Sequence, residues 1–356
     1  MRVLAWVPQV YDTSPGQRFR IEQWEPYLRA QGIEIVWSPF SDLALTRLLP
    51  QAAHWGAKLL KVGRALGRRL GEALRGRGFD LVYVFREDAL MGPAFAARLL
   101  RWSRVPFVFD FDDAVWVRYV SPSNSYLSYL RFSGKTAFLC RGARSVIAGN
   151  RFLADYAERH NRQVSIVPTT IDTSRYRRVV RTDASVPVIG WSGSFSTLQH
   201  LNLVRPALER LRKRRPFRVV VVGAEGFEAT GVQVEHRPWR PETEVADISS
   251  FDVGLMPLPD NEWERGKCGL KALQYMALSV PAVVSPVGVN KEIAQDGETG
   301  LWARNDGEWE HALERLLDSR ELRLRLGAAG RQIVETRYSA AVHAPRVADI
   351  LRGAAA

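Results

Sequence analysis

Residues Trp263 to Trp302 read WERGKCGLKALQYMALSVPAVVSPVGVNKEIAQDGETGLW, and this stretch decides the fold class. A glycine-bearing loop enters a helix predicted over 270–278, a strand follows over 282–285, and PVGVN then forms a turn. In a parallel α/β sheet such a turn lies at the carboxyl edge, where ligands bind. The free N–H groups and the positive dipole end of the helix favour an anion there. The stretch therefore predicts an anion-binding α/β domain.

The same order of elements occurs twice in the chain. From Pro187 the sequence reads PVIGWSGSFSTLQHLNLVRPALERL, which predicts a strand, a loop of glycine and serine, and a helix. The N-terminal half opens in the same way, with a strand over 3–7, the loop DTSPGQ and an amphipathic segment over 19–28. Further strands alternate with helical segments in both halves, which is typical of parallel sheets. We therefore predict two doubly wound domains.

The length and composition agree with two globular domains. The chain has 356 residues, of which 46% are hydrophobic and 25% charged, enough for two full cores. We assign residues 1–180 to the N-terminal domain, 181–335 to the C-terminal domain, and 336–356 to a helix that packs back toward the N-terminal domain. Two such domains suggest a cleft with one substrate on each side.

Charge and cysteine usage limit the class of partner and the compartment. Fifty Lys and Arg against 38 Asp and Glu give a net charge of +12, which suits a phosphate-bearing substrate, nucleic acid or anionic lipid. Cys140 and Cys268 are too few for a disulfide framework or a zinc site, so we expect a reducing, cytoplasmic compartment. No stretch reaches the roughly 18 apolar residues of a membrane-spanning helix.

The stretch around residue 270 resembles glycosyltransferase family 4, whose members are retaining nucleotide-sugar enzymes of the GT-B fold. The family pattern GLxxLEAMAxGxPVV, a VG turn and a dGxxG element correspond to GLKALQYMALSVPAVVSPVG and DGETG. The family's two glutamates, with seven residues between them, fall on Gly266 and Gln274. The carbonyl of Gln274 can still accept a hydrogen bond from a ribose hydroxyl. For the first glutamate, Glu264 or backbone amides are the substitutes.

The resemblance implies a GT-B fold of two Rossmann-like domains that face each other across a cleft. It also implies transfer of a hexosyl group from a nucleoside-diphosphate sugar to an acceptor hydroxyl with retention, in the synthesis of polysaccharide, glycolipid or another glycoconjugate. The nucleotide sugar is then a co-substrate, and the acceptor is a sugar, a lipid-linked sugar or a small molecule. Family members generally need no metal, so we expect no metal site and no cofactor.

Basic residues near the predicted helix are our candidates for neutralising the donor diphosphate. The family's Arg and Lys pair is missing after the first strand of the C-terminal domain, so we assign this catalytic role to Lys267 and Lys271. Solvated helix charges are the alternative interpretation of both lysines. The predicted donor-binding residues are Gly16, Arg18, Gly193, Ser194, Lys267, Lys271, Gln274, Gly288 and Val289.

The loop after the first strand contributes two of these residues. Gly16 lies where the family brings the backbone close to the donor phosphate. Arg18 and Arg20 lie where the following helix begins, and phosphate contact and ordinary exposed helix arginines are both open interpretations for them.

Acidic residues after another predicted strand are our candidates for the acceptor site. VFDFDDAVW places Asp110, Asp112 and Asp113 directly after a buried strand, at the edge of the sheet that faces the cleft. We assign all three to binding and orienting the acceptor hydroxyl, and Asp110 and Asp112 also to catalysis, with capping of the loop as the alternative. Arg86 and Glu87, which end a further strand, are candidates for the same pocket.

Residues 47–79 carry an excess of basic side chains over an apolar stripe. Eight Lys and Arg face one acidic residue there, and apolar residues recur at steps of three and four. The basic residues are Arg47, Lys58, Lys61, Arg64, Arg68, Arg69, Arg75 and Arg77, and the stripe is Trp55, Leu59, Val62, Leu66, Leu70 and Leu74. Such a helix binds the anionic inner face of a membrane, or packs on the sheet with a solvated basic face, and both can hold. Nucleic acid is disfavoured, because no recognised module accompanies the charge.

Two other functions stay open on the sequence. One is a GT-B epimerase or hydrolase that acts on the nucleotide sugar without a second substrate. The other is a non-catalytic basic protein that binds nucleic acid or anionic lipid, with a donor site that has lost both glutamates.

Overall fold

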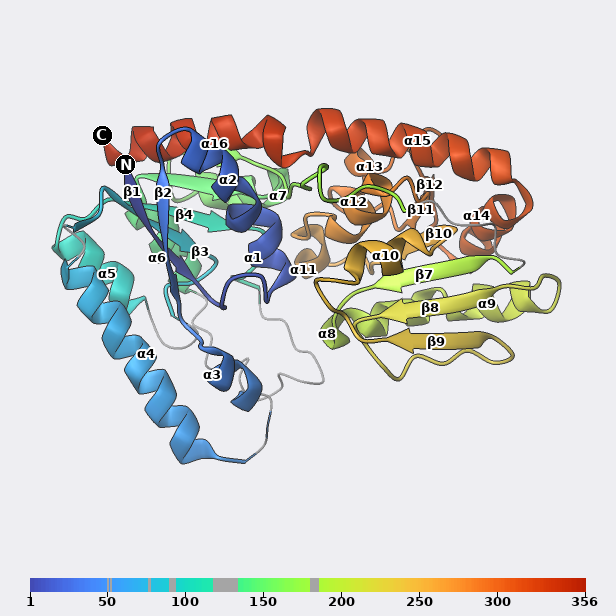
Figure 1. The fold of residues 1–356 in the computed structure, drawn as a ribbon, viewed down its shortest axis with the longest axis horizontal. Coiled ribbons are helices and arrows are strands. Elements are labelled where there is room, and N and C mark those ends of the chain that lie inside the picture. Colours follow the sequence, from blue (N-terminus) through green and yellow to red (C-terminus); the bar gives the residue numbers. More distant parts are fainter. Residues whose placement is uncertain (50, 52, 76–77, 90–93, 118–133, 180–185) are drawn as a thin grey trace. The chain divides into compact units, whose positions relative to one another are not determined.

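A computed structural model describes the chain except for residues 50, 52, 76–77, 90–93, 118–133 and 180–185. The described residues form two units, each built on one parallel six-stranded sheet (Figure 1). Unit 1 contains Met1–Thr169, Gly266–Cys268 and Ala341–Ala356, and unit 2 contains Thr170–Arg265 and Gly269–Ala340. The prediction of two doubly wound α/β domains is confirmed.

The sheet of unit 1 has the order β2-β1-β3-β4-β5-β6, with every neighbouring pair parallel. Its strands are β1 (Arg2–Val7), β2 (Glu34–Pro39), β3 (Leu81–Phe85), β4 (Phe107–Phe111), β5 (Ser145–Ala148) and β6 (Val164–Ile166). The helices are α1 (Pro15–Gln17), the π-helical turn η1 (Arg18–Glu22), α2 (Gln23–Ala30), α3 (Leu43–Leu48), α4 (Trp55–Arg75), α5 (Phe95–Trp102), α6 (Gly134–Gly142), α7 (Arg151–Glu158) and α16 (Ala340–Ala355). Every residue of β3 and β4 is buried, as in central parallel strands that are covered on both faces.

The sheet of unit 2 has the order β12-β11-β10-β7-β8-β9, again with parallel neighbours. Its strands are β7 (Val188–Ser192), β8 (Arg218–Val222), β9 (Gln233–Arg237), β10 (Val253–Met256), β11 (Ala282–Val284) and β12 (Leu301–Trp302). The helices are α8 (Phe195–Leu198), the 3-10 helix η4 (Gln199–Leu203), α9 (Arg205–Arg212), α10 (Glu244–Ser249), α11 (Glu262–Arg265), α12 (Leu270–Ala277), α13 (Asn290–Ile293), α14 (Asp306–Asp318) and α15 (Arg320–Arg337).

Each sheet has one point at which the strand order reverses. In unit 1 the chain runs outward in opposite directions from β1 and β3, and in unit 2 from β7 and β10. Loops that leave adjacent strands on opposite sides of such a point open a crevice at the carboxyl edge of the sheet, and ligands of open α/β sheets bind there. A ligand site is therefore expected at the loops after these four strands.

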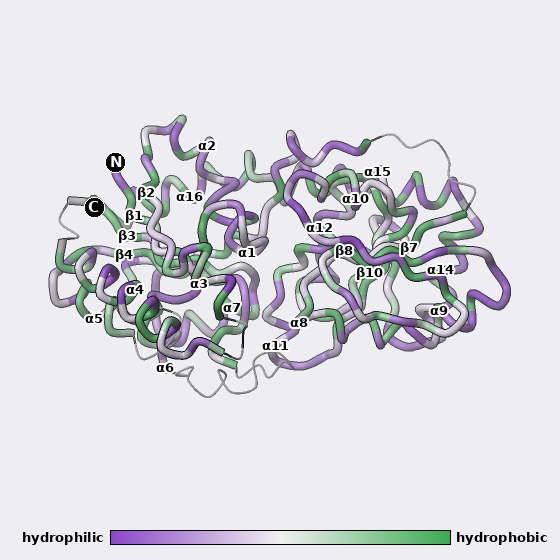
Figure 2. The backbone as a smooth tube through the Cα atoms, turned by 60° about the horizontal axis from the view of Figure 1, so that its bottom comes forward, coloured by the Kyte–Doolittle hydropathy of each residue, from purple (hydrophilic) through white to green (hydrophobic). Residues whose placement is uncertain are grey.

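The core of unit 2 shows how the helices hold this edge in place. Ile189 of β7, Val219 of β8 and Val253 of β10 lie in one buried cluster with Leu208 of α9 and Leu313 of α14. In Figure 2, hydrophobic residues appear as green stretches of the backbone in both units. Burial of each such side chain contributes about 1.5–3 kcal/mol, so the strands that end at the reversal point are firmly held.

The two units divide after Thr169, ahead of the predicted boundary at residue 180, which itself lies outside the described residues. Residues 170–179 belong to unit 2 because Ile171 pairs with Ser339 and the Tyr176 hydroxyl donates to Glu244. The end of the chain forms two helices, α15 in unit 2 and α16, most of which belongs to unit 1. Arg352 of α16 donates a hydrogen bond of 2.8 Å to the carbonyl of Gln31.

Helix α4 occupies the basic segment, and only part of the predicted apolar stripe faces the core, where Val62 and Leu66 pack against the buried cluster of Phe40, Ala65 and Ala89. Among its described side chains, Ala65, Ala73 and the basic Lys58 and Arg69 are buried, whereas Trp55 of the stripe is 62% exposed. Arg69 is satisfied inside the protein by the carbonyl of Ser38, 3.0 Å from Nη1, and by the ring of Trp6. Arg77 and the side chain of Arg75 lie outside the described residues.

Candidate active site

In unit 2, Lys271 lies against the chain that leaves β7. Helix α12 begins after Gly269, whose φ of 71° favours glycine, so that Lys271 stands in the first helical turn. Its Nζ is 5.4 Å from the ring centre of Trp191, and a Cβ on Gly193 would lie 2.7 Å from its Cε. Gly193 must therefore be glycine for the lysine to pack here. A full positive charge and the positive end of a helix thus lie beside the backbone that follows β7.

Gln274 follows Lys271 by one turn on the same helix and is buried, with 4% of its surface exposed. Its Nε2 donates a hydrogen bond of 2.9 Å to Oε1 of Glu244, the first residue of α10. Trp239 Nε1 donates to the same oxygen at 2.8 Å, and the Tyr176 hydroxyl donates to Oε2. Glu244 is not among the residues predicted from the sequence. The signal for it was Gln274 itself, since an amide in place of a family glutamate leaves room for a carboxylate beside it.

The remaining donor candidates of unit 2 lie in two turns. Gly288 has a φ of 53°, and a Cβ there would be 2.8 Å from the carbonyl oxygen of Arg265, so no other residue fits without strain. Val289 next to it is buried, and Asn290 Nδ2 closes the turn on the carbonyl of Ser285 at 3.1 Å. Ser194 lies at the N-terminus of α8, with its Oγ 2.9 Å from Oγ of Ser196.

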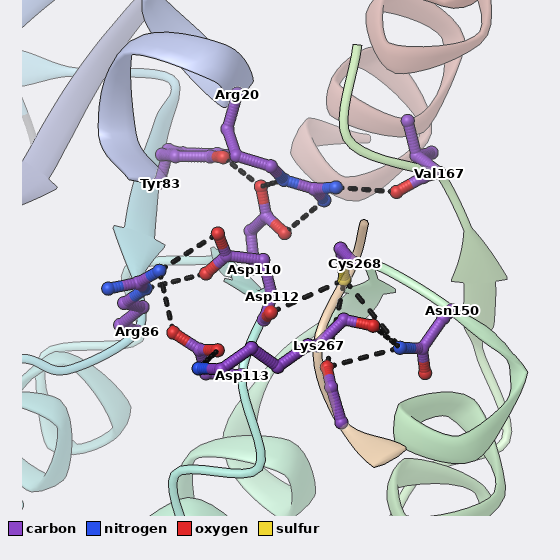
Figure 3. A network of polar contacts seen from close by, with 11 residues as sticks. Arg20, Tyr83, Arg86, Asp110, Asp112, Asp113, Asn150, Val167, Lys267 and Cys268 are labelled. Atoms are coloured by element: carbon purple, nitrogen blue, oxygen red, sulfur yellow. Dashed lines mark hydrogen bonds and ion pairs between the residues drawn. The ribbon is translucent and has the colours of Figure 1, made fainter. Parts of the chain in front are cut away.

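Gly266, at the position of the family's first glutamate, has no room for a side chain. A Cβ there would be 2.6 Å from Cβ and 2.8 Å from the backbone nitrogen of Ala114. The segment is held to unit 1 by Asn150 Nδ2, which donates to the carbonyls of Gly266 and Lys267 at 3.1 and 3.0 Å, and by Cys268, whose Sγ faces the carbonyl of Asp112 (Figure 3). A glutamate is therefore excluded by packing at this position.

Glu264, the proposed substitute for this glutamate, is only 1% exposed. Its Oε1 lies 3.2 Å from Nε2 of His200, which is also buried. The ring of His200, in η4, thus faces inward onto this carboxylate.

In unit 1, Arg86 joins two of the predicted acceptor residues (Figure 3). Its Nε lies 2.5 Å from Asp112 Oδ1, its Nη2 lies 2.8 Å from Asp113 Oδ2, and Lys267 Nζ lies 3.4 Å from Asp113 Oδ1. Burial disfavours the charge of Arg86, but Asp112 and Asp113 outweigh it and raise its pKa. A Cβ on Gly16 would be 2.9 Å from Cζ of Arg86, so this glycine admits the guanidinium to the loop after β1.

Arg86 also has an unusual backbone. Its φ of 60° is rare for a residue with a side chain and marks a conformation that the surroundings must hold in place. The residue directly follows β3, beside the reversal point of the sheet. The arginine thus stands where a ligand of unit 1 is expected, with its charge shared by two carboxylates.

Asp110 does not lie with Asp112 and Asp113. The prediction that it follows the strand β4 is wrong. Strand β4 runs on to Phe111, so Asp110 is inside the strand and fully buried. Its Oδ1 and Oδ2 lie 2.5 and 3.2 Å from Nη2 and Nε of Arg20, and the Tyr83 hydroxyl also donates to it. Burial raises the pKa of the Asp110 carboxyl, and Arg20 partly offsets this. We conclude that Asp110 is a structural residue.

The other predicted residues of unit 1 have partners of their own. Arg20 is fully buried, and its Nη1 donates to the carbonyl of Val167 at 2.6 Å, so it is neither an exposed helix arginine nor free to contact phosphate. Arg18 is buried too, with its Nε 2.7 Å from Asp12 Oδ1. Glu87 faces Lys135, whose Nζ lies 3.3 Å from Oε2.

The structure thus assembles two sets of predicted residues. Gly193, Lys271 and Gln274 meet at the β7 side of unit 2. The set in unit 1 is Gly16, Arg86, Asp112, Asp113 and Lys267. Lys267 and Lys271 belong to different units. Within the described residues, no three His, Cys, Asp or Glu side chains are grouped as metal ligands would be.

Two doubly wound units, one of them with a lysine at its reversal point, define the class of GT-B glycosyltransferases. Residues 16–175 match the family described as Glycosyltransferase Family 4, and residues 186–319 match Glycosyl transferases group 1. The chain thus carries these two glycosyltransferase domains, one in each half, which confirms the resemblance seen in the sequence. No curated protein matches this chain.

Solved structures with the same fold include three bacterial proteins. HepE of Anabaena in complex with UDP-glucose is 16% identical, with 99% of each chain covered and a TM-score of 0.69. A glycosyltransferase of Rickettsia africae is 13% identical, with 99% of this chain and 98% of that chain covered and a TM-score of 0.69. A sucrose-phosphate synthase of Thermosynechococcus elongatus is 15% identical, with the same coverages and TM-score. These similarities establish the GT-B fold.

Proposed function

We propose that the protein is a retaining glycosyltransferase that moves a hexosyl group from a nucleoside-diphosphate sugar to an acceptor hydroxyl. The observation that carries this proposal is Lys271, packed on Gly193 beside the loop that leaves β7. A cation at a helix N-terminus and at the reversal point of the sheet suits a diphosphate. Since HepE is described in complex with UDP-glucose, uridine diphosphate sugars are the donors to test first.

In this proposal the chain's own side chains supply the charge that the reaction needs. The bond between the anomeric carbon and the phosphate oxygen breaks, and Lys271 stabilises the negative charge that grows on the departing diphosphate. The acceptor oxygen bonds to the anomeric carbon from the same face and gives its proton to that phosphate. Asp112, Asp113 and Arg86 bind and orient the acceptor. Because basic side chains do this work, we expect activity to persist in EDTA.

We expect a nucleotide sugar to raise the melting temperature of the protein. A ligand that binds only the folded chain at 100 times its dissociation constant adds about 2.7 kcal/mol to the free energy of unfolding. The screen compares UDP-, ADP-, GDP- and CDP-sugars by thermal shift, and mass spectrometry then follows the product with and without an acceptor. Conversion of the donor alone at full rate would instead indicate an epimerase or hydrolase. No shift with any donor would contradict the proposal.

We further propose that α3, α4 and α5 contact an anionic membrane surface. Seven of the thirteen large hydrophobic side chains that are exposed among the described residues lie on these helices. They are Leu43, Trp55, Leu59, Leu60, Leu74, Phe95 and Trp102. Exposed Arg64 follows Leu60 by four residues and therefore lies on the same side of α4. Apolar and basic side chains exposed together are what a helix at an anionic interface needs. No described helix is long and apolar enough to cross a bilayer.

Binding to vesicles tests this surface. The wild type should sediment with vesicles of phosphatidylcholine and phosphatidylglycerol, and less with phosphatidylcholine alone, since each basic residue near the surface contributes about 1 kcal/mol. Leu59→Gln with Leu60→Gln should weaken binding about tenfold. Leu324→Gln, an exposed leucine of α15, is the matched control. Equal binding of all three proteins, or a dimer that forms through α4 without lipid, would contradict the proposal.

A further inference from the structure

The carboxylate of Glu244, buried in unit 2, has no role in the reaction proposed above. Glu244 is only 1% exposed and accepts hydrogen bonds from three neutral side chains. Trp239 and Gln274 both donate to Oε1, at 2.8 and 2.9 Å, and the Tyr176 hydroxyl donates to Oε2. A buried carboxylate is costly unless its oxygens are satisfied, and here three residues from separate parts of the chain satisfy it.

This carboxylate determines which way the amide of Gln274 points. A carboxylate only accepts hydrogen bonds, so the NH2 group of Gln274 must face Glu244 and its carbonyl oxygen must face away. The opposite orientation would place two acceptors against each other. Within the described residues no group donates a hydrogen bond to Oε1 of Gln274. Glu244 therefore leaves that oxygen as an open acceptor with a set direction.

The open acceptor is well placed for one part of the proposed donor. Gln274 and Lys271 stand three residues apart on α12, so they share a face with about 5–6 Å between their Cβ atoms. If Lys271 holds the diphosphate, the ribose that is bonded to it comes next along this face. A ribose hydroxyl is a donor that a directed carbonyl oxygen can bind.

We propose that Glu244 is a positioning residue that makes Gln274 a selective acceptor for a ribose hydroxyl. The inference rests on the proposed function. It also explains the residue at position 274, because a glutamate there would stand beside the buried carboxylate of Glu244 and repel it. In this chain the negative charge has moved from α12 to α10, and the helix keeps only an oriented amide. A glutamate at position 274 should therefore be tolerated only when Glu244 is replaced at the same time.

A charge-exchange cycle tests this pair. Calorimetry gives the dissociation constants of UDP, 2′-deoxy-UDP and 3′-deoxy-UDP for the wild type, Gln274→Glu, Glu244→Gln and the double variant. If another base binds better in the screen of UDP, ADP, GDP and CDP, its three forms are used. We expect the wild type to prefer the ribonucleotide by about tenfold over at least one deoxy form. Gln274→Glu should lose this preference, and the double variant should regain it.

The single Glu244→Gln variant is the matched control. The oxygen of the new amide can still accept hydrogen bonds from Trp239 and Gln274, while its NH2 group donates to the hydroxyl of Tyr176. Most of the preference for the ribonucleotide should therefore remain. A purely structural role would change melting temperatures without changing the ratio of the dissociation constants. Additive effects in the double variant, or a wild type that binds UDP without preference, would overturn the inference. A wild type that binds none of the four diphosphates would instead overturn the proposed function.

Discussion

Lys271→Ala should lower the turnover of sugar transfer by about 100-fold to 1000-fold. The ammonium group packs on the backbone after β7, where the proposed diphosphate leaves, so its charge matters most in the transition state. An interaction made only there lowers kcat and kcat/KM together. The melting temperature should change by less than about 2 °C, because the side chain is only half-buried.

Two further variants make this result specific. Lys213→Ala removes an exposed lysine of the same unit and should leave turnover unchanged. Lys271→Arg keeps the charge but not the compact ammonium group, so it should recover part of the turnover. Near-normal turnover of Lys271→Ala would remove Lys271 from the mechanism.

The elements around the donor site could be predicted because their signals are local. The helix expected over 270–278 is α12 (Leu270–Ala277), and the strand expected over 282–285 is β11 (Ala282–Val284). Glycines before the helix and in the turn after the strand marked their ends. A repeated order of strand, loop and helix was enough to predict two doubly wound domains.

The partners of buried charges could not be predicted, because they are distant in the sequence. Arg20 and Asp110 are 90 residues apart, and periodicity around either one carries no sign of the other. Gly266 lacks a side chain because of Ala114, which is equally remote. In α4 the apolar period indicated one apolar face, yet the carbonyl of Ser38 accepts a hydrogen bond from buried Arg69, and Leu59 of that face is exposed. The local sequence pattern predicts helices and strands, whereas these contacts depend on the tertiary fold.

Arg20→Leu should destabilise the protein more than any other substitution proposed for this chain. Asp110 would keep a buried carboxylate without its cation, and breaking a buried ion pair in this way costs about 3–5 kcal/mol. For a unit of this size we expect the melting temperature to fall by about 10 °C. Arg29→Leu is the matched control. This arginine on α2 is 74% exposed in its pair with Glu25, so its loss should cost at most about 1 kcal/mol.

The stability that Arg20→Leu loses should depend on pH in a defined direction. Burial raises the pKa of Asp110 above its value in the unfolded chain, and the charge of Arg20 opposes this rise. Without Arg20 the pKa rises further, so the contribution of the carboxyl to stability is present at low pH and is lost as pH increases through the folded pKa. The deficit of Arg20→Leu should therefore be larger at pH 8 than at pH 5 in thermal unfolding. Adding Asp110→Asn should recover most of it at pH 8, because a neutral amide needs no counter-charge. A deficit that grew on acidification, or that survived this second substitution in full, would mean that the ion pair is not what holds β4 and η1 together.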